Sequence, residues 1–185
     1  MGGGRINPLQ EALRVEGLER GYSFPSVSFS PLPEPRVIIT KVTGRTYNLE
    51  ISDYFRDLPD RLAREYAATV MDCITGGLPT VPEEVRRHIR EHSLEKYIRR
   101  NGYFEPREIR ETDLEGIVNA LKDHGKLPGD ITVLWTADPK SSHISPTFRV
   151  IAVPLYLLEE HDDSEIICEV LANYRILKAR TGGIA

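Results

Sequence analysis

Hydrophobic and polar positions along the chain follow two periods, and the changes between them predict a mixed α+β fold. The runs Arg36–Thr43 and Thr46–Ser52 are rich in Val, Ile, Tyr and Thr and flank Gly44, which predicts a β-hairpin. Further along the chain, Asp130–Thr136 and Thr147–Val153 have the composition of two more strands. The segment between those strands is polar and rich in turn residues, so we expect a loop there.

Helical spacing of apolar residues, bounded by capping residues, marks the remaining longer segments. Thr112 with Glu115, and Asp162 with Glu165, have the spacing of N-terminal capping boxes. A proline in the first turn at Pro59 is compatible with a helix start. We expect helices at Pro59–Ile74, Pro82–Arg100, Thr112–His124 and Ser164–Ala179.

The first 35 residues differ from the rest because prolines interrupt them. Pro25, Pro31, Pro33 and Pro35 block regular helix and favour extended backbone before them. A short helix over Pro8–Glu19 is compatible with this pattern. We therefore expect a proline-rich N-terminal arm over residues 1–35 and one α+β domain over residues 36–185. The arm is either a mobile tail or a segment that packs on the domain or on a partner.

Composition and charge argue against several classes of protein. The chain has 185 residues, 40% hydrophobic and 28% charged, which is typical of a globular domain with a core. Its net charge of −4 does not favour polyanion binding, and no apolar run reaches the ~20 residues of a membrane span. No N-terminal stretch resembles a signal peptide, and the two cysteines lie far apart. We therefore expect a cytoplasmic protein with reduced thiols and no membrane association.

The order hairpin, three helices, two strands and final helix resembles small zinc peptidases of the SprT-like and minimal gluzincin kind. The resemblance runs from Val37 to Tyr174, and three local matches carry it. Thr46–Leu58 with Pro59 is similar to their opening hairpin, and Ile131–Thr136 to the strand that ends in a tryptophan, here Trp135. Phe148–Leu158 followed by Ile166–Ala172 is similar to their edge strand and active-site helix. The resemblance implies a zincin-like α+β domain, with helices on a small mixed sheet and a C-terminal former active-site helix.

In that family the final helix carries His-Glu-x-x-His, in which two histidines four residues apart bind zinc and the glutamate activates the bound water. Laid on this motif, Cys168 takes the first histidine's place, Glu169 the glutamate's and Ala172 the second histidine's. The family's third ligand follows this helix, where few residues remain. The resemblance therefore implies a vestigial motif that holds no metal. Glu169 is then either a retained catalytic base or an ordinary helix carboxylate.

Both cysteines have a structural explanation in this pattern. Cys73 lies on the apolar face of its helix, and Cys168 lies on a stripe with Ile167, Leu171 and Ile176. A free cysteine on such a face behaves as a small buried hydrophobic residue, so we expect neither to be a ligand or a nucleophile.

A second set of metal ligands is conceivable on the charged helix. His88, Glu91 and His92 match the inverted motif His-x-x-Glu-His, and Glu169 would serve as the additional acidic ligand. Arginines surround the histidines and the segment has little apolar support, whereas metal ligands need a shell that orients them. The pattern favours a solvated helix, with zinc at His88, His92 and Glu169 as the alternative.

Two other groups of polar residues suggest functions that we regard as secondary. Basic and aromatic residues alternate from Arg86 to Arg110, and Arg99, Arg100 and Tyr103 would be the binding residues of a nucleic-acid surface. Interspersed acids favour a salt-bridged face instead. Ser141, Ser142 and His143 with nearby Asp138 suggest a hydrolase, but the glycines of a nucleophile elbow are missing, so we expect an ordinary loop.

The leading hypothesis is a non-catalytic metallopeptidase-like protein that binds a protein partner or serves as a scaffold in a complex. The binding element would be the former cleft or the edge of the hairpin Arg36–Ser52, which an extended peptide could join as an added strand. No cofactor is expected, and the arm would support homo-oligomers. The alternatives are an active zinc metallopeptidase, through Cys168 and Glu169 or through the inverted motif, and a nucleic-acid-associated protein.

Overall fold

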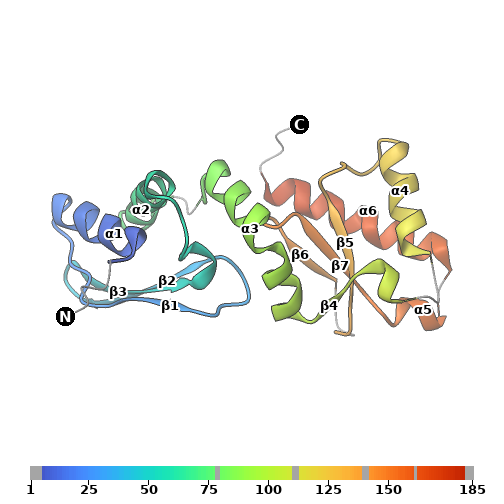
Figure 1. Cartoon of the computed structure of the whole chain (residues 1–185), viewed down its shortest axis with the longest axis horizontal. Helices are drawn as coiled ribbons and strands as arrows, with labels where there is room; N and C mark the ends of the chain where they lie inside the picture. Colours follow the sequence, from blue (N-terminus) through green and yellow to red (C-terminus); the bar gives the residue numbers. More distant parts are fainter. Residues whose placement is uncertain (1–5, 78–79, 110–112, 139–141, 161, 182–185) are drawn as a thin grey trace. The chain divides into compact units, whose positions relative to one another are not determined.

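The computed structural model describes residues 6–77, 80–109, 113–138, 142–160 and 162–181. The protein is α+β, as the sequence predicts. It divides into two compact units, Met1–Leu94 and Glu95–Ala185, with the boundary inside a long helix (Figure 1). The sequence predicts a different division, an arm over residues 1–35 and one domain over residues 36–185.

The N-terminal unit packs two helices on one face of a three-stranded sheet (Figure 1). Its elements are α1 (Pro8–Glu19), β1 (Val27–Ser30), β2 (Val37–Thr43), β3 (Thr46–Ser52), the 3-10 helix η1 (Asp53–Phe55) and α2 (Asp60–Ile74). The strand order is β1-β3-β2, with β1 parallel and β2 antiparallel to β3. The predicted hairpin and the helix that follows it are therefore confirmed.

The described residues of the predicted N-terminal arm contribute to this unit's core, which agrees with the alternative of a packed segment and not with a mobile tail. Leu9 and Leu13 of α1 are fully buried, and Val27 of β1 pairs with Leu49 of β3. Helix α1 begins as its sequence indicates, with the Asn7 side chain accepting a hydrogen bond from the Leu9 backbone N–H at 3.0 Å and Pro8 in the first turn. The four prolines lie on either side of β1 and leave that strand free to pair.

The C-terminal unit is built on a four-stranded sheet of order β4-β5-β7-β6. Its elements are the end of α3 (Glu83–Asn101), β4 (Tyr103–Phe104), the 3-10 helix η2 (Pro106–Glu108), α4 (Leu114–Asp123), β5 (Thr132–Thr136), β6 (His143–Ser145), β7 (Val150–Pro154), α5 (Leu157–Glu160) and α6 (Asp163–Arg180). Strands β5 and β7 are parallel, whereas β4 and β6 run antiparallel to their neighbours.

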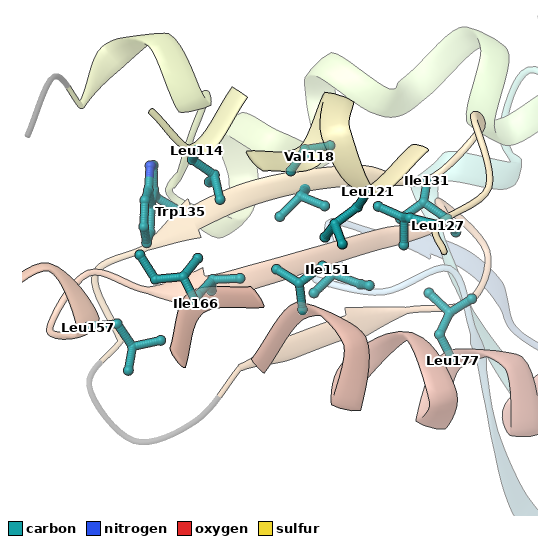
Figure 2. Packing of buried hydrophobic residues seen from close by; sticks show 13 residues of the cluster. Leu114, Val118, Leu121, Leu127, Ile131, Trp135, Ile151, Leu157, Ile166 and Leu177 are labelled. Atoms are coloured by element: carbon teal, nitrogen blue, oxygen red, sulfur yellow. The ribbon is translucent and has the colours of Figure 1, made fainter. Parts of the chain in front are cut away.

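One face of this sheet forms the main hydrophobic core, together with α4 and α6 (Figure 2). Strand residues alternate between the two faces, so β5 contributes Val133 and Trp135, and β7 contributes Ile151 and Val153. On the opposite face, Tyr103 meets the ring of Tyr97 edge-on, with ring centroids 5.7 Å apart. The helices on the core face contribute Leu114, Val118 and Leu121 from α4 and Ile166, Val170 and Leu177 from α6.

Several predicted boundaries in this unit need correction. The second predicted strand starts at Val150 instead of Thr147, because Arg149 has a positive φ of 53° and ends the preceding turn. The predicted loop between the strands contains β6, which pairs with β7. Thr112, the predicted cap of α4, lies outside the described residues, and Asp113 caps the helix by accepting a hydrogen bond from the Gly116 backbone N–H at 2.8 Å.

Candidate functional site

Helix α6 buries one stripe of residues, and that stripe excludes two positions of the predicted vestigial motif. The buried residues Ile166, Val170, Asn173 and Leu177 recur at intervals of four, three and four. Cys168 and Ala172 are exposed on another side of the helix. The predicted burial of Cys168 is therefore wrong. Each residue turns the helix by about 100°, and Cys168 lies two residues from each of its buried neighbours Ile166 and Val170.

Ile176, which the sequence placed on the same apolar stripe as Cys168, is also 45% exposed. Ile167 and Leu171, the other members of that stripe, are partly buried against the core. The sheet thus contacts the side of α6 that carries Val170 and Asn173, and this orientation brings Glu169 to the margin of the sheet.

Glu169 is half-buried and held by two side chains. The Ser142 hydroxyl donates a hydrogen bond to Glu169 Oε1, and Asn173 Nδ2 donates to the same oxygen at 2.8 Å. Asn173 Nδ2 also donates to the backbone carbonyl of Glu169 at 2.9 Å. Asn173 is only 6% exposed, so its amide has its hydrogen-bond partners inside the protein. From the sequence, Ser142 was considered only beside His143 and Asn173 was not considered, although an asparagine within an apolar helical stripe was a usable signal.

Strand β6 sends neighbouring side chains to opposite faces of the sheet. Ser142, directly before β6, reaches Glu169, and Ile144 packs against the core that α6 covers. His143 lies on the other face, where its Nε2 is 3.0 Å from Asp138 Oδ2 and its ring centroid is 6.1 Å from that of Tyr103. Ser142 and His143 therefore cannot act as a nucleophile and its base, and the suggested hydrolase arrangement is not formed. Ser141 lies outside the described residues.

A groove of about 420 Å³ follows this margin of the C-terminal unit. In the sheet order, β6 comes last, and among the residues that the structure describes no strand pairs with its outer side. The groove combines a sheet edge, a fixed carboxylate and exposed apolar side chains, including Tyr156 and Ile176. Its lining residues are Ser142, Ile144, Tyr156, Glu169, Asn173, Ile176 and Arg180.

The alternative ligand set draws on residues of both units, and the complete set stays a prediction. The rings of His88 and His92 stack with centroids 4.1 Å apart, and His92 Nδ1 lies 2.8 Å from the His88 carbonyl oxygen. Both histidines belong to the N-terminal unit, whereas Glu169 belongs to the C-terminal unit. Within the five described segments, no three His, Cys, Asp or Glu side chains form a group that could hold a metal ion.

The predicted solvated character of α3 is wrong on one side of the helix. Val85, Ile89 and Tyr97 are buried and recur at intervals of four and eight, which is a narrow apolar stripe that the surrounding charges hide in the sequence. Two ion pairs on α3 agree with the predicted salt-bridged face, since Glu83 lies 2.8 Å from Arg86 and 3.9 Å from Arg90.

The three predicted nucleic-acid-binding residues do not form a common surface. Tyr103 is 8% exposed and packs against Tyr97, so its assignment as a binding residue is wrong. Arg99 is exposed and Arg100 is half-buried. A stacking aromatic residue is needed beside the arginines for sequence-tolerant binding of bases, and Tyr103 does not offer its ring to solvent.

His88 provides a pH-dependent contribution to stability. Burial lowers the pKa of His88 and the neighbouring His92 ring adds to this, while the Asp57 carbonyl and the Glu91 and Asp57 carboxylates act in the opposite direction. The folded state therefore favours the neutral ring. Its stabilising contribution is complete above the unfolded pKa and is lost as the pH falls below that value.

We expect His88→Gln to reduce the loss of stability between about pH 7 and pH 5, since the unfolded histidine titrates near pH 6.5. The measurement is the free energy of unfolding from urea titrations at several pH values. His124→Gln is the control, because His124 is an exposed C-cap residue whose ring bonds to the Ala120 carbonyl of its own helix. An unchanged pH profile in the His88 variant would contradict the assignment.

Two other features of the N-terminal unit are the thiol of Cys73 and a groove along its helices. Burial raises the pKa of the Cys73 thiol, and the neighbouring Asp72 carboxylate adds to this, so the reactive thiolate is disfavoured. A groove of about 570 Å³ lies along α1 and α2 and is lined by Ile6, Val15 and several acidic residues. Its lining residues include no serine, threonine, cysteine, lysine or histidine, so no hydroxyl, thiol, amine or imidazole lies beside these carboxylates.

No family model, no curated protein and no solved structure matches this chain. The resemblance to SprT-like peptidases and the zincin-like fold therefore stay predictions. None of the described helices is both long enough and apolar enough to cross a membrane.

Proposed function

We propose that this chain is a non-catalytic, metallopeptidase-like domain that binds an extended segment of a protein partner beside β6. The single observation that supports this most is the groove in which β6, an edge strand of the sheet, runs beside α6. A strand at the edge of a sheet offers backbone donors and acceptors, and side-chain pockets beside it provide specificity. The proposal keeps the predicted cytoplasmic location and the absence of a cofactor.

The contacts of Glu169 support binding in preference to catalysis. A catalytic glutamate in a zinc peptidase must reach a metal-bound water. Here Oε1 is occupied by the Ser142 hydroxyl and the Asn173 amide, and the two positions that would carry histidines point to solvent. Glu169 is thus a fixed carboxylate in the wall of a groove, which is the role of a recognition residue.

We expect linear peptides selected from a random library on the immobilised full chain to bind beside β6. Binding should slow the hydrogen exchange of amides within residues 143–145, since an added strand pairs with those N–H groups that point away from β7. We expect Ile176→Arg to weaken binding by about tenfold or more, because it places a charge on an apolar part of the groove.

Leu18→Arg is the matched control, because Leu18 is 79% exposed on α1 and lies outside this groove. Selected peptides that leave exchange at 143–145 unchanged would contradict the proposal. Metal analysis gives an independent check: stoichiometric zinc that is lost in the variant with both His88→Ala and His92→Ala would favour the alternative metallopeptidase.

A further inference from the structure

The groove residues on α6 place opposite charges at the two ends of one stripe. Glu169, Asn173, Ile176 and Arg180 are spaced by four, three and four residues, so they follow the same side of the helix. From Glu169 to Arg180 the helix rises by about 16 Å at 1.5 Å per residue. Along that distance the groove passes from a carboxylate, through an apolar side chain, to a guanidinium.

The carboxylate of Glu169 and the guanidinium of Arg180 can each still bind a ligand. Glu169 Oε1 accepts from Ser142 and Asn173, whereas no described residue donates to Oε2. Arg180 is exposed and forms no ion pair with any acidic residue in the described segments. The bonds from Ser142 and Asn173 fix the Glu169 carboxylate in place, so a ligand does not need to order it.

The topology determines which end of an added strand meets which charge. In Figure 2, Ile166 near the start of α6 lies toward Trp135 at the end of β5, and Leu177 lies toward Ile131, just before β5. Helix α6 is therefore antiparallel to β5 and β7. Strand β6 is antiparallel to β7, so β6 and α6 run in the same direction. A strand that adds antiparallel to β6, the more common and more stable pairing, runs from the Arg180 end to the Glu169 end.

We propose, resting on the proposed function, that the partner segment carries an acidic residue at position i, an apolar residue at i+2 and a basic residue at i+4. Side chains on one face of a strand recur every two residues, and four residues extend over about 13.6 Å. The long acidic and basic side chains cover the remaining distance to Arg180 and Glu169. The apolar side chain meets Ile176 between the two charges.

Two peptides of identical composition test the order of the charges. One carries Glu-Ser-Leu-Ser-Lys and the other the reverse, Lys-Ser-Leu-Ser-Glu, each between the same neutral flanks with blocked ends. We expect the first to bind about tenfold more tightly at low salt, because partly exposed ion pairs each contribute only a few-fold. The preference should shrink as salt is added. The measurement is fluorescence anisotropy of labelled peptide titrated with the full chain.

Variants of the chain assign the two charges. Glu169→Gln keeps an oxygen for Ser142 and Asn173. A peptide with lysine at i+4 should bind this variant no more tightly than a peptide with methionine at i+4. In the same way, a peptide with glutamate at i should bind the Arg180→Glu variant no more tightly than a peptide with glutamine at i. Arg175→Glu is the control on the same helix, since Arg175 is exposed and outside the groove, and the preferences for lysine and for glutamate should both persist in it.

The possible outcomes distinguish a failure of this inference from a failure of the proposed function. Equal binding of the two peptides would overturn the charge order but would leave peptide binding beside β6 intact. Library peptides that protect β6 while neither designed peptide binds would also overturn the charge order alone. Library peptides that leave β6 unprotected would overturn the proposed function, and this inference with it.

Discussion

Trp135→Ala is expected to lower the free energy of unfolding of the C-terminal unit by about 3–5 kcal/mol, the usual cost of removing a large aromatic ring from a core. Trp135 is fully buried between β5 and the helices on the core face (Figure 2). The core cluster that contains Trp135 draws on α4, β5, β7, α5 and α6, so we do not expect the remaining cavity to close by moving one of them. Urea unfolding followed by far-ultraviolet circular dichroism measures the loss without using the tryptophan itself.

Trp135→Phe is the informative control for that variant. The indole Nε1 is buried and has no hydrogen-bond acceptor among the described residues. Phenylalanine removes this unpaired donor, which relieves a penalty of about 1–3 kcal/mol and offsets part of the lost packing. We therefore expect Trp135→Phe to cost less than half as much as Trp135→Ala. Equal losses would contradict this expectation, because both variants remove the donor and only Trp135→Phe keeps a ring to fill the site.

Asn173→Asp is expected to lower the free energy of unfolding by about 3 kcal/mol at neutral pH, because it places a second, nearly buried carboxylate beside Glu169. Asn173 Nδ2 donates to Glu169 Oε1 at 2.8 Å, and a carboxylate at that position would repel the oxygen that the amide binds. The substitution changes few atoms, so packing is almost preserved. A loss of stability would then measure the repulsion between the introduced carboxylate and Glu169.

The sign of the pH dependence follows from the direction of the shift. Burial and the neighbouring Glu169 raise the pKa of the introduced carboxyl in the folded state above its unfolded value near 3.9. The variant should therefore approach wild-type stability below about pH 4 and lose stability as the pH rises through the raised pKa. Unfolding followed by fluorescence of Trp135, the single tryptophan in the sequence, measures this for both proteins at each pH.

Asn173→Leu is the matched control, because it removes the same amide without adding a charge. Its loss relative to wild type should rise far less from acidic to neutral pH than that of Asn173→Asp, because it loses a hydrogen bond to Glu169 but adds no charge. If the Asp variant showed a loss independent of pH, the contact between residue 173 and the Glu169 carboxylate would be of no energetic importance. The site would then rest on packing alone.

The proposed site depends on the rotation of one helix. The length and position of α6 follow from its sequence, since Asp162 caps it by accepting from the Ser164 and Glu165 backbone N–H groups at 2.9 and 3.2 Å. Its sequence also contains two competing apolar stripes. One of them includes Cys168 and Ile176, and the other includes Val170 and Leu177. Local periodicity does not determine which of the two stripes is buried. Packing against the sheet buries the second one.

Strand pairing explains the other differences between expectation and structure. Strands β1 and β6 are short and polar, and each exists because a neighbour supplies its hydrogen bonds: Val27 pairs with Leu49, and Ile144 with Ile151. A short polar segment has no stable strand conformation alone, so its own composition predicts a loop. The same argument applies to the N-terminal residues, which prolines mark as extended but which the N-terminal unit incorporates.

The sequence by itself determined the positions of the longer helices, the hairpin Val37–Ser52 and the α+β class, because capping residues, turn glycines and apolar periods act within a few neighbouring residues. Only the tertiary structure decided that residues 6–35 join a first unit, that β6 forms, and that Glu169 meets Ser142 and Asn173 at the edge of a sheet. These features depend on contacts between residues far apart in the chain. Their free energy comes from burial and pairing that no local segment contains.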